Sequence, residues 1–349
     1  MALQASGQIK YSEIIAEFGT PNNGGLGEYR LSENVGSLSN LPLDTGVPQS
    51  GQIKFSDFYS KRLNQVVDLH SIGNSTSRQN AKDRWNNGNV HIVGSSKTGK
   101  TQPPDTIDDR VIINVNNTIR SVKGTQTHCA LRTGNWDSGT VLEIEIGTSG
   151  KLYGSGGNGG SGGSANETAG TDGQTGSSAL GIEYPCSINN LGIIQSGYGG
   201  GGGGGGNTRT TGGGKKSGAT TNGSSGGGGG GGAGLPAGNG GGVQTPVAVG
   251  GGSAGSAGAA GSLSNLVTGA GTGGAGGSEA GSGGNASAVN NSATKADDGG
   301  TYVVDGNQQS ADGGIGGNNG YAIITNQVSA PSLSGNSVTG RTVTSTNPT

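Results

Sequence analysis

The chain has 349 residues, and 80 of them are Gly, against a usual share of about 7%. Hydrophobic residues make up only 28%, with 3 Phe, 8 Tyr and 2 Trp, so one apolar core cannot extend through the whole chain. A net charge of −2 without a long Lys or Arg run argues against electrostatic binding to nucleic acid or to an anionic membrane. Neither a secretory signal nor an 18-residue apolar window is present, so we expect no export and no membrane insertion, with synthesis and assembly in a cytoplasm.

The first 63 residues contain an internal repeat. SGQIKYSEI at residues 6–14 returns as SGQIKFSDF at residues 50–58. Ser12 and Ser56 each precede an acidic residue and an apolar run, which predicts a helix N-cap in each copy. A unit of about ten residues is too small to fold alone, so the copies must pack against each other or against a partner. The matched apolar residues are Ile9 and Ile53, Tyr11 and Phe55, and Ile14 and Phe58.

Residues 64–152 have the pattern of a small β domain with a one-sided core. Short β-prone segments occur at residues 90–93, 111–115, 119–122 and 141–146. In the last of these, apolar and acidic residues alternate as in a strand with one solvated face. Asn116-Asn117 between two β-prone segments indicates a hairpin turn, and Trp85 and Trp136 are the expected anchors of the core.

Residues 153–320 are dominated by glycine tracts, at residues 154–163, 197–206, 226–232, 250–261 and 269–277. In several tracts Gly returns at every third position, which is the period of polyproline II. Collagen is excluded because the chain has only 10 Pro and the register does not persist. Two alternatives remain: a disordered linker, and a stack of polyglycine-II helices joined by backbone hydrogen bonds. We favour the stack, because recurrent non-Gly turns at residues 207–211, 235–237 and 262–268 punctuate the tracts.

Several apparent chemical motifs lack the context that their chemistry needs. GSSKTGKT at residues 94–101 matches a phosphate-binding loop, but Pro103-Pro104 prevents the helix that such a loop must open. Glu143 and Glu145 are two residues apart on one strand face, the pattern of a solvated strand rather than of a hydrolytic pair.

The sequence gives equally little support for a metal site or a nucleophile. His70, His91 and His128 have no paired ligand spacing, and Cys129 and Cys186 are expected to be free thiols. The acidic residues Asp297, Asp298, Asp305 and Asp312 could hold Ca²⁺ but lack the spacing of an EF-hand. We therefore expect no enzyme activity, no cofactor and no metal.

Several motifs, in chain order, resemble a family of bacteriophage tail-tip receptor-binding adhesins with a glycine-rich distal domain. The SGQIK repeats are similar to short repeats near the N-termini of those proteins. VLEIEI followed by GKLYGSGG in residues 141–157, and SSALGIEYPCSINNLGIIQSGYGGGGGGGG at residues 177–206, resemble their strand and glycine segments. GNNGYAI at residues 317–323 resembles their closing motif.

The resemblance implies a mostly β and irregular fold with four parts: an attachment region (1–63), a small β domain (64–152), a polyglycine-II sandwich (153–325) and a C-terminal tail (326–349). It implies a protein of the virion, at the tip of a tail or tail fibre. Its partners would be other tail or baseplate proteins and a bacterial surface receptor, either an outer-membrane protein or a glycan. A structural fibre or baseplate connector without receptor specificity is the alternative. The virion-attachment candidates are Ile9, Tyr11, Ile14, Ile53, Phe55 and Phe58.

Recognition is expected in the turns between tracts, because glycine carries no side-chain chemistry. Only the end of the stack remote from the β domain would face a host. The receptor-binding candidates are the cationic cluster Arg209, Lys215 and Lys216, together with Leu235, Asn239, Leu263 and Asn265. The same reasoning predicts that Gly203→Val destabilises the stack strongly and that Asn207→Ala in the adjoining turn is nearly silent.

Overall fold

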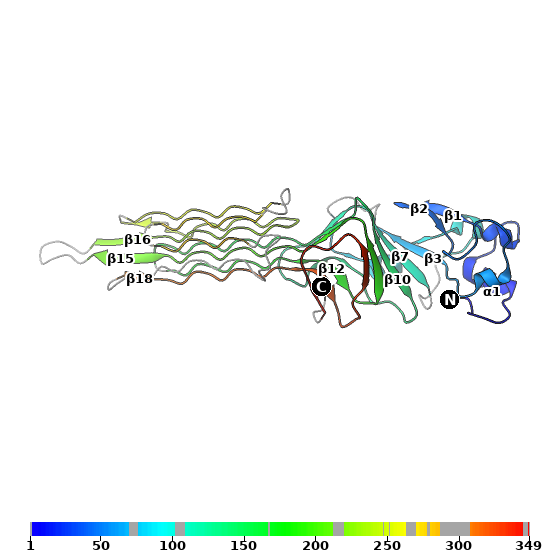
Figure 1. The fold of residues 1–349 in the computed structure, drawn as a ribbon. Coiled ribbons are helices and arrows are strands. Elements are labelled where there is room, and N and C mark those ends of the chain that lie inside the picture. Colours follow the sequence, from blue (N-terminus) through cyan, green and yellow to red (C-terminus); the bar gives the residue numbers. More distant parts are fainter. Residues whose placement is uncertain are drawn as a thin grey trace, which may run out of the picture.

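The computed structural model describes residues 2–69, 76–101, 109–166, 168–211, 220–246, 248–250, 252–262, 270–277, 280–286, 308–344 and 348. The molecule is elongated: the N-terminal region lies at one end, a β domain lies in the middle, and a bundle of extended segments leads to the other end (Figure 1). The fold is mostly β, as expected. Within the described part, no helix is long and apolar enough to span a membrane.

The N-terminal region packs around a cluster of aromatic rings. Its elements are α1 (Tyr11–Phe18), the 3₁₀-helices η1 (Leu26–Tyr29) and η2 (Phe55–Phe58), and the hairpin of β1 (Ser32–Val35) and β2 (Leu38–Pro42). The Phe58 ring lies 5.9 Å from that of Phe18 and 5.6 Å from that of Tyr29, both edge to face. The two repeat units therefore pack on each other, and their apolar residues Ile9, Ile14 and Phe58 are buried within the chain.

The helical turn of each repeat begins two residues earlier than the serine caps predict. Lys10, not Ser12, is the N-cap of α1, so the expected serine cap is wrong. The backbone N–H of Lys10 donates instead to the carboxylate of Glu13 at 2.7 Å, because an acidic residue three positions after the cap can reach back to it. The second copy is arranged in the same way by the equivalent residues Lys54, Phe55, Ser56 and Asp57.

The β domain is a parallel β-helix in which the chain passes through three sheets in turn. The first sheet contains β3 (Asn64–Asp68), β7 (Arg110–Val115), β10 (Val141–Ile146), β13 (Cys186–Asn190) and β20 (Ser332–Gly335), with β6 (His91–Ile92) antiparallel at its edge. The second contains β4 (Thr76–Ser77), β8 (Thr118–Arg120), β11 (Lys151–Tyr153) and β14 (Ile193–Gln195). The third contains β5 (Gln79–Asn80), β9 (Cys129–Arg132), β12 (Ser178–Ile182), β19 (Tyr321–Thr325) and β21 (Arg341–Val343). The short helices α2 (Ala81–Asn86) and α3 (Ser95–Thr98) also belong to this part of the chain.

This topology corrects one expectation and confirms another. Asn116-Asn117 is not a hairpin turn: it joins β7 to β8 in a different sheet, and both strands pair in parallel with later ones. Trp85 and Trp136 do anchor the core inside the β-helix, with ring centroids 6.0 Å apart.

The outer face of the first sheet is covered only over its first two turns. In β7, Val111 and Ile113 point into the β-helix core, whereas Ile112 packs with the N-terminal region. In β10 the inward residues are buried, but Glu143 and Glu145 on the outer face are only partly covered. Burial is thus continuous along β7 but alternates along β10, where the N-terminal region no longer covers the outer face of the sheet.

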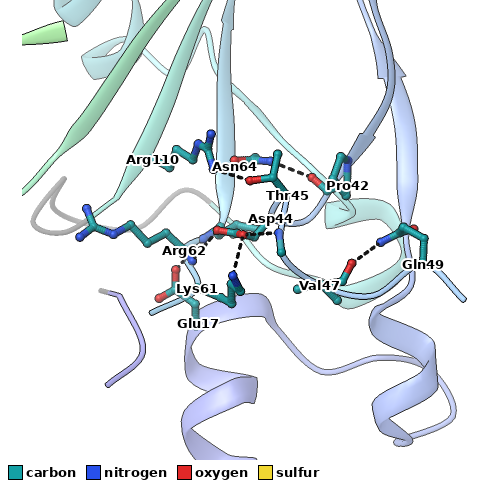
Figure 2. Close-up of polar contacts among 12 residues, drawn as sticks. Glu17, Pro42, Asp44, Thr45, Val47, Gln49, Lys61, Arg62, Asn64 and Arg110 are labelled. Atoms are coloured by element: carbon teal, nitrogen blue, oxygen red, sulfur yellow. Dashed lines mark hydrogen bonds and ion pairs between the residues drawn. The ribbon is translucent and has the colours of Figure 1, made fainter. Parts of the chain in front are cut away.

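Polar contacts fix the N-terminal region to the β-helix (Figure 2). The Asn64 amide at the start of β3 donates to the carbonyl of Pro42 at 2.9 Å, and Asp44 holds the segment just before β3 by accepting the backbone N–H of Arg62 at 2.9 Å. The Arg110 guanidinium of β7 donates to the Thr45 hydroxyl at 2.7 Å. These bonds and the shared apolar cluster join the two parts into one body.

The glycine-rich segments are insertions into two successive turns of the β-helix. Residues 154–177 separate β11 from β12, and residues 196–320 separate β14 from β19. Residues 178–195 and 321–325 therefore belong to the β-helix rather than to the glycine domain. The expected C-terminal tail is also part of it, because β20 pairs with β13 and β21 pairs with β19.

The inserted segments bond to one another with a period of three residues. The N–H groups of Gly157, Gly160 and Gly163 each donate, at 2.8 Å, to the carbonyls of Tyr198, Gly201 and Gly204. A period of three residues is also the period of a polyproline-II helix. The described segments are 154–164, 168–177, 196–206, 225–234, 238–246, 252–262, 270–277, 280–286 and 311–320.

The glycine content of a segment follows its position in the stack. Segment 225–234, which we call the central segment, contains the run Gly226–Gly232 and bonds to segments 154–164, 196–206, 238–246, 252–262, 270–277 and 280–286. Each of its glycines would place a Cβ against a neighbouring backbone. In segment 252–262, at the edge, only every third residue is Gly and faces inward, while the Ala and Ser residues between are largely exposed. A segment with three residues per turn therefore needs glycine at every position only where neighbouring segments cover all three of its faces.

Candidate functional site at the distal end of the stack

A small antiparallel sheet closes the end of the stack that is remote from the β-helix (Figure 1). Its strands are β15 (Asn207–Thr211), β16 (Thr220–Ser224), β17 (Ala248–Val249) and β18 (Gln308–Ser310). β15 and β16 pair from Asn207 with Ser224 to Thr211 with Thr220. The expected turn at 207–211 is therefore wrong: these residues form a strand of a projecting hairpin.

Asn207 holds the base of this hairpin. Its side chain is buried, and the carboxamide oxygen of that side chain accepts the backbone N–H of Ser224 at 3.2 Å. The Ser224 hydroxyl in turn accepts the N–H of Ser253 at 3.0 Å. Asn207→Ala would leave a buried N–H without its acceptor, so the expectation that this substitution is silent does not agree with the structure.

A second polar cluster lies at the same end of the stack. The Thr168 hydroxyl donates to that of Ser164 at 2.9 Å, and it lies 3.4 Å from the carboxamide oxygen of Gln244. The N–H of Ala165 donates to the carbonyl of Pro246 at 2.8 Å. The chain reversal after segment 154–164 is thus tied to segment 238–246.

The receptor-binding candidates from the sequence do not all lie at the distal end. The backbone of Arg209 is in β15, within the projecting hairpin. Leu235 and Asn239 lie at the opposite end, next to the β-helix: the N–H of Leu235 donates to the carbonyl of Gly154, which directly follows β11. Outside the described residues lie the other candidates, Lys215, Lys216, Leu263 and Asn265.

The virion-attachment candidates are mainly core residues. Ile9, Ile14 and Phe58 are buried in the apolar cluster of the N-terminal region, so they cannot contact a partner directly. Their burial follows from the packing of the two repeats on each other. Phe55 is 42% exposed, and the partly covered candidates are Tyr11 and Ile53.

The phosphate-loop pattern at residues 94–101 forms a short helical turn, α3. The backbone N–H of Gly94 donates to the carboxylate of Glu33 at 2.7 Å, and the same oxygen lies 2.7 Å from Nε2 of His91. A protein carboxylate therefore occupies the position that a phosphate would need at this amide.

The two thiols are separate and shielded. Cys129 and Cys186 are free, and burial raises the pKa of each thiol to about 12. Within the described ranges, no group of three or more His, Cys, Asp or Glu side chains is placed to hold a metal ion.

Comparisons with known proteins give one structural likeness. No protein-family model and no curated sequence matches the chain. Among solved structures, the chain is similar to the crystal structure of the gp37-gp38 adhesin tip complex of the bacteriophage S16 long tail fiber, with 18% identity and a TM-score of 0.38. The alignment covers 97% of this chain and 99% of that chain.

Proposed function

We propose that this chain is a bacteriophage tail-tip adhesin that attaches to the virion through its N-terminal region and binds a host surface receptor at the distal end of the glycine stack. The arrangement of the chain is the main support. The N-terminal region and the projecting hairpin lie at opposite ends of an elongated body (Figure 1), so one end can be docked while the other meets a cell. The motifs of the sequence agree with this function.

The stack is suited to hold variable side chains at a distance. Its segments are joined mainly by backbone-to-backbone hydrogen bonds, so side chains can vary where no neighbouring backbone covers them. Side chains with hydrogen-bonding or ionic groups return in the hairpin, where Arg209 stands in β15. We propose that the hairpin recognises the receptor by non-covalent binding, without catalysis.

Competition for host cells tests the proposed receptor site. The purified full chain should block adsorption of phage particles that carry the same chain, and replacing Arg209, Lys215 and Lys216 together by Ala should reduce that blocking. A charge-matched control replaces Lys10, Lys54 and Lys97, which are exposed far from the hairpin. Equal blocking by both variants, at unchanged melting temperature, would contradict a receptor site in the hairpin.

Particle assembly separates an adhesin from a structural connector. If the chain is a connector, a substitution in the hairpin should lower its incorporation into particles. If it is an adhesin, the same variant should be incorporated normally, and the particles should fail to adsorb to cells. At the other end, Phe55→Arg should lower incorporation, because a charge would enter the proposed contact with the virion. Ile315→Arg is the matched control, since Ile315 is 57% exposed on the stack. Normal incorporation of the Phe55 variant would refute attachment through this face.

A further inference from the structure

The outer face of the first sheet of the β-helix is hollowed where the N-terminal region stops covering it. One hollow of about 440 Å³ lies over β10, β13 and β20, and a second of about 330 Å³ lies between β10 and the β1–β2 hairpin. Glu145 lines both, so the two hollows adjoin on either side of its side chain, and we call them together the lateral groove. It crosses successive turns of the β-helix, well away from the distal hairpin.

The groove is lined by groups that form hydrogen bonds. The carboxylates of Glu143 and Glu145, the hydroxyls of Ser187 and Ser332, and the carboxamide of Asn189 all lie on its first part. They stand on neighbouring parallel strands, about 4.8 Å apart, so they form a regular ladder of polar groups. Because they project from the face of a sheet, a ligand would meet side chains rather than the backbone.

Two contacts hold the carboxylates in place. The Arg110 guanidinium donates to one oxygen of Glu143 at 2.7 Å and balances its charge. The Asn189 amide donates to one oxygen of Glu145 at 2.8 Å, and burial raises the pKa of Glu145. In each case the second oxygen accepts no hydrogen bond from the described residues and can accept one from a ligand.

The chemistry of the groove selects its occupant. With Glu143 balanced by Arg110, the lining carries one uncompensated negative charge, which disfavours anionic ligands and gives little attraction for a polycation. Carboxylates and hydroxyls are instead good partners for ligand hydroxyl groups. Leu191, 48% exposed, adds an apolar surface in the second hollow for C–H groups.

We propose that the lateral groove binds a neutral, hydroxyl-rich oligosaccharide, as a site separate from the distal hairpin. Such a site would hold the side of the molecule against surface glycan while the distal end reaches its receptor. It does not depend on the identity of that receptor.

Binding by the full-length chain tests the groove. The probe is the neutral polysaccharide released from host cell envelopes, with a panel of neutral oligosaccharides of defined sequence, measured by titration calorimetry and saturation-transfer NMR. We expect saturable binding that Glu145→Gln weakens about 10-fold or more, through loss of a charge-assisted hydrogen bond. Ser332→Trp should abolish binding by filling the groove.

A matched variant and the proposed function provide the controls. Ser337→Trp adds the same ring at an exposed position outside the groove lining and should bind like the wild type. The distal triple variant should also bind the polysaccharide normally. No saturable binding by the wild type, or unchanged binding by Ser332→Trp, would overturn the proposal. An equal loss of binding in the control Ser337→Trp would also overturn it. Adsorption to cells through the hairpin is a separate measurement, so either proposal can fail alone.

Discussion

A single methyl group at Gly203 tests whether backbone contact between segments stabilises the glycine stack. A Cβ at this residue would lie 2.8 Å from the amide nitrogen of Gly162 and closer still to the carbonyl oxygen of Ser161. Ordinary contacts of a Cβ begin near 3.4 Å. The backbone around Ser161 would therefore have to retreat by about 1 Å, in a region packed on every side.

The expected cost follows from the hydrogen bonds that this movement would disturb. The Ser161 carbonyl accepts the N–H of Thr171 at 2.9 Å, and Gly203 itself donates to Thr171 at 2.9 Å and accepts from Gly314 at 2.7 Å. At about 1 kcal/mol each, loss of these bonds costs about 3 kcal/mol. The smaller entropy of the unfolded Ala chain offsets about 0.4–1 kcal/mol, which leaves a loss of about 2 kcal/mol.

Native-state hydrogen exchange, read by mass spectrometry, measures this loss segment by segment. Gly203→Ala should speed exchange of the amides in segments 154–164, 168–177 and 196–206 by about 30-fold, the equivalent of about 2 kcal/mol. Gly242→Ala is the control: no described atom lies within 4 Å of a Cβ there, so its stability should stay equal or rise slightly. Unchanged exchange in Gly203→Ala, or equal acceleration in both variants, would refute the packing argument.

Three further predictions concern other parts of the molecule. Asn207→Ala should destabilise the hairpin by about 1–2 kcal/mol through loss of its buried hydrogen bond, seen as faster exchange of the hairpin amides and refuted by unchanged exchange. Cys129, which is buried and has a thiol pKa of about 12, should react with a disulfide reagent at pH 8 only after unfolding; rapid reaction of this thiol in the native protein would contradict its burial. Burial raises the pKa of Glu17, so the folded state binds its proton more tightly, and this contribution to stability is lost as pH rises through the folded pKa. Glu17→Gln should keep an acceptor for the N–H of Leu63 and reduce the fall in melting temperature between pH 5 and pH 7.5; an unchanged fall would contradict this.

The glycine stack could be largely predicted from local sequence, because its physical rule is local. The uninterrupted run Gly226–Gly232 indicates a segment with neighbours on all sides, and the three-residue repeat of segment 252–262 indicates an edge. Both follow from the fact that a Cβ fits only on an uncovered face. The hairpin of β15 and β16 could not be distinguished from a turn, because short polar segments rich in Thr and Asn occur in both.

The β-helix could not be predicted in the same way, because its strands pair with partners distant in sequence. In the β-helix β14 is followed by β19 only after more than a hundred inserted residues, and β19 then pairs with β12, which precedes the whole insertion. The alternation in β10 and the continuous burial of β7 also depend on where the N-terminal region lies. The apolar residues of the SGQIK repeats predict a surface for a partner, whereas Ile14 and Phe58 belong to the cluster that covers the chain's own first sheet.

The junction between β-helix and stack explains how a domain without an apolar core can project rigidly. Parallel pairing of β11 with β14 continues directly into segments 154–164 and 196–206, since Gly154 donates to Gln195 and Gly157 to Tyr198. The stack therefore begins as an extension of a sheet already in register, with no linker between them. An insertion of one residue within a segment would rotate every following glycine by a third of a turn and bring side chains against backbone. An insertion in a chain reversal leaves that register unchanged, so packing confines sequence variation to the reversals, among them those at the end proposed to meet the host.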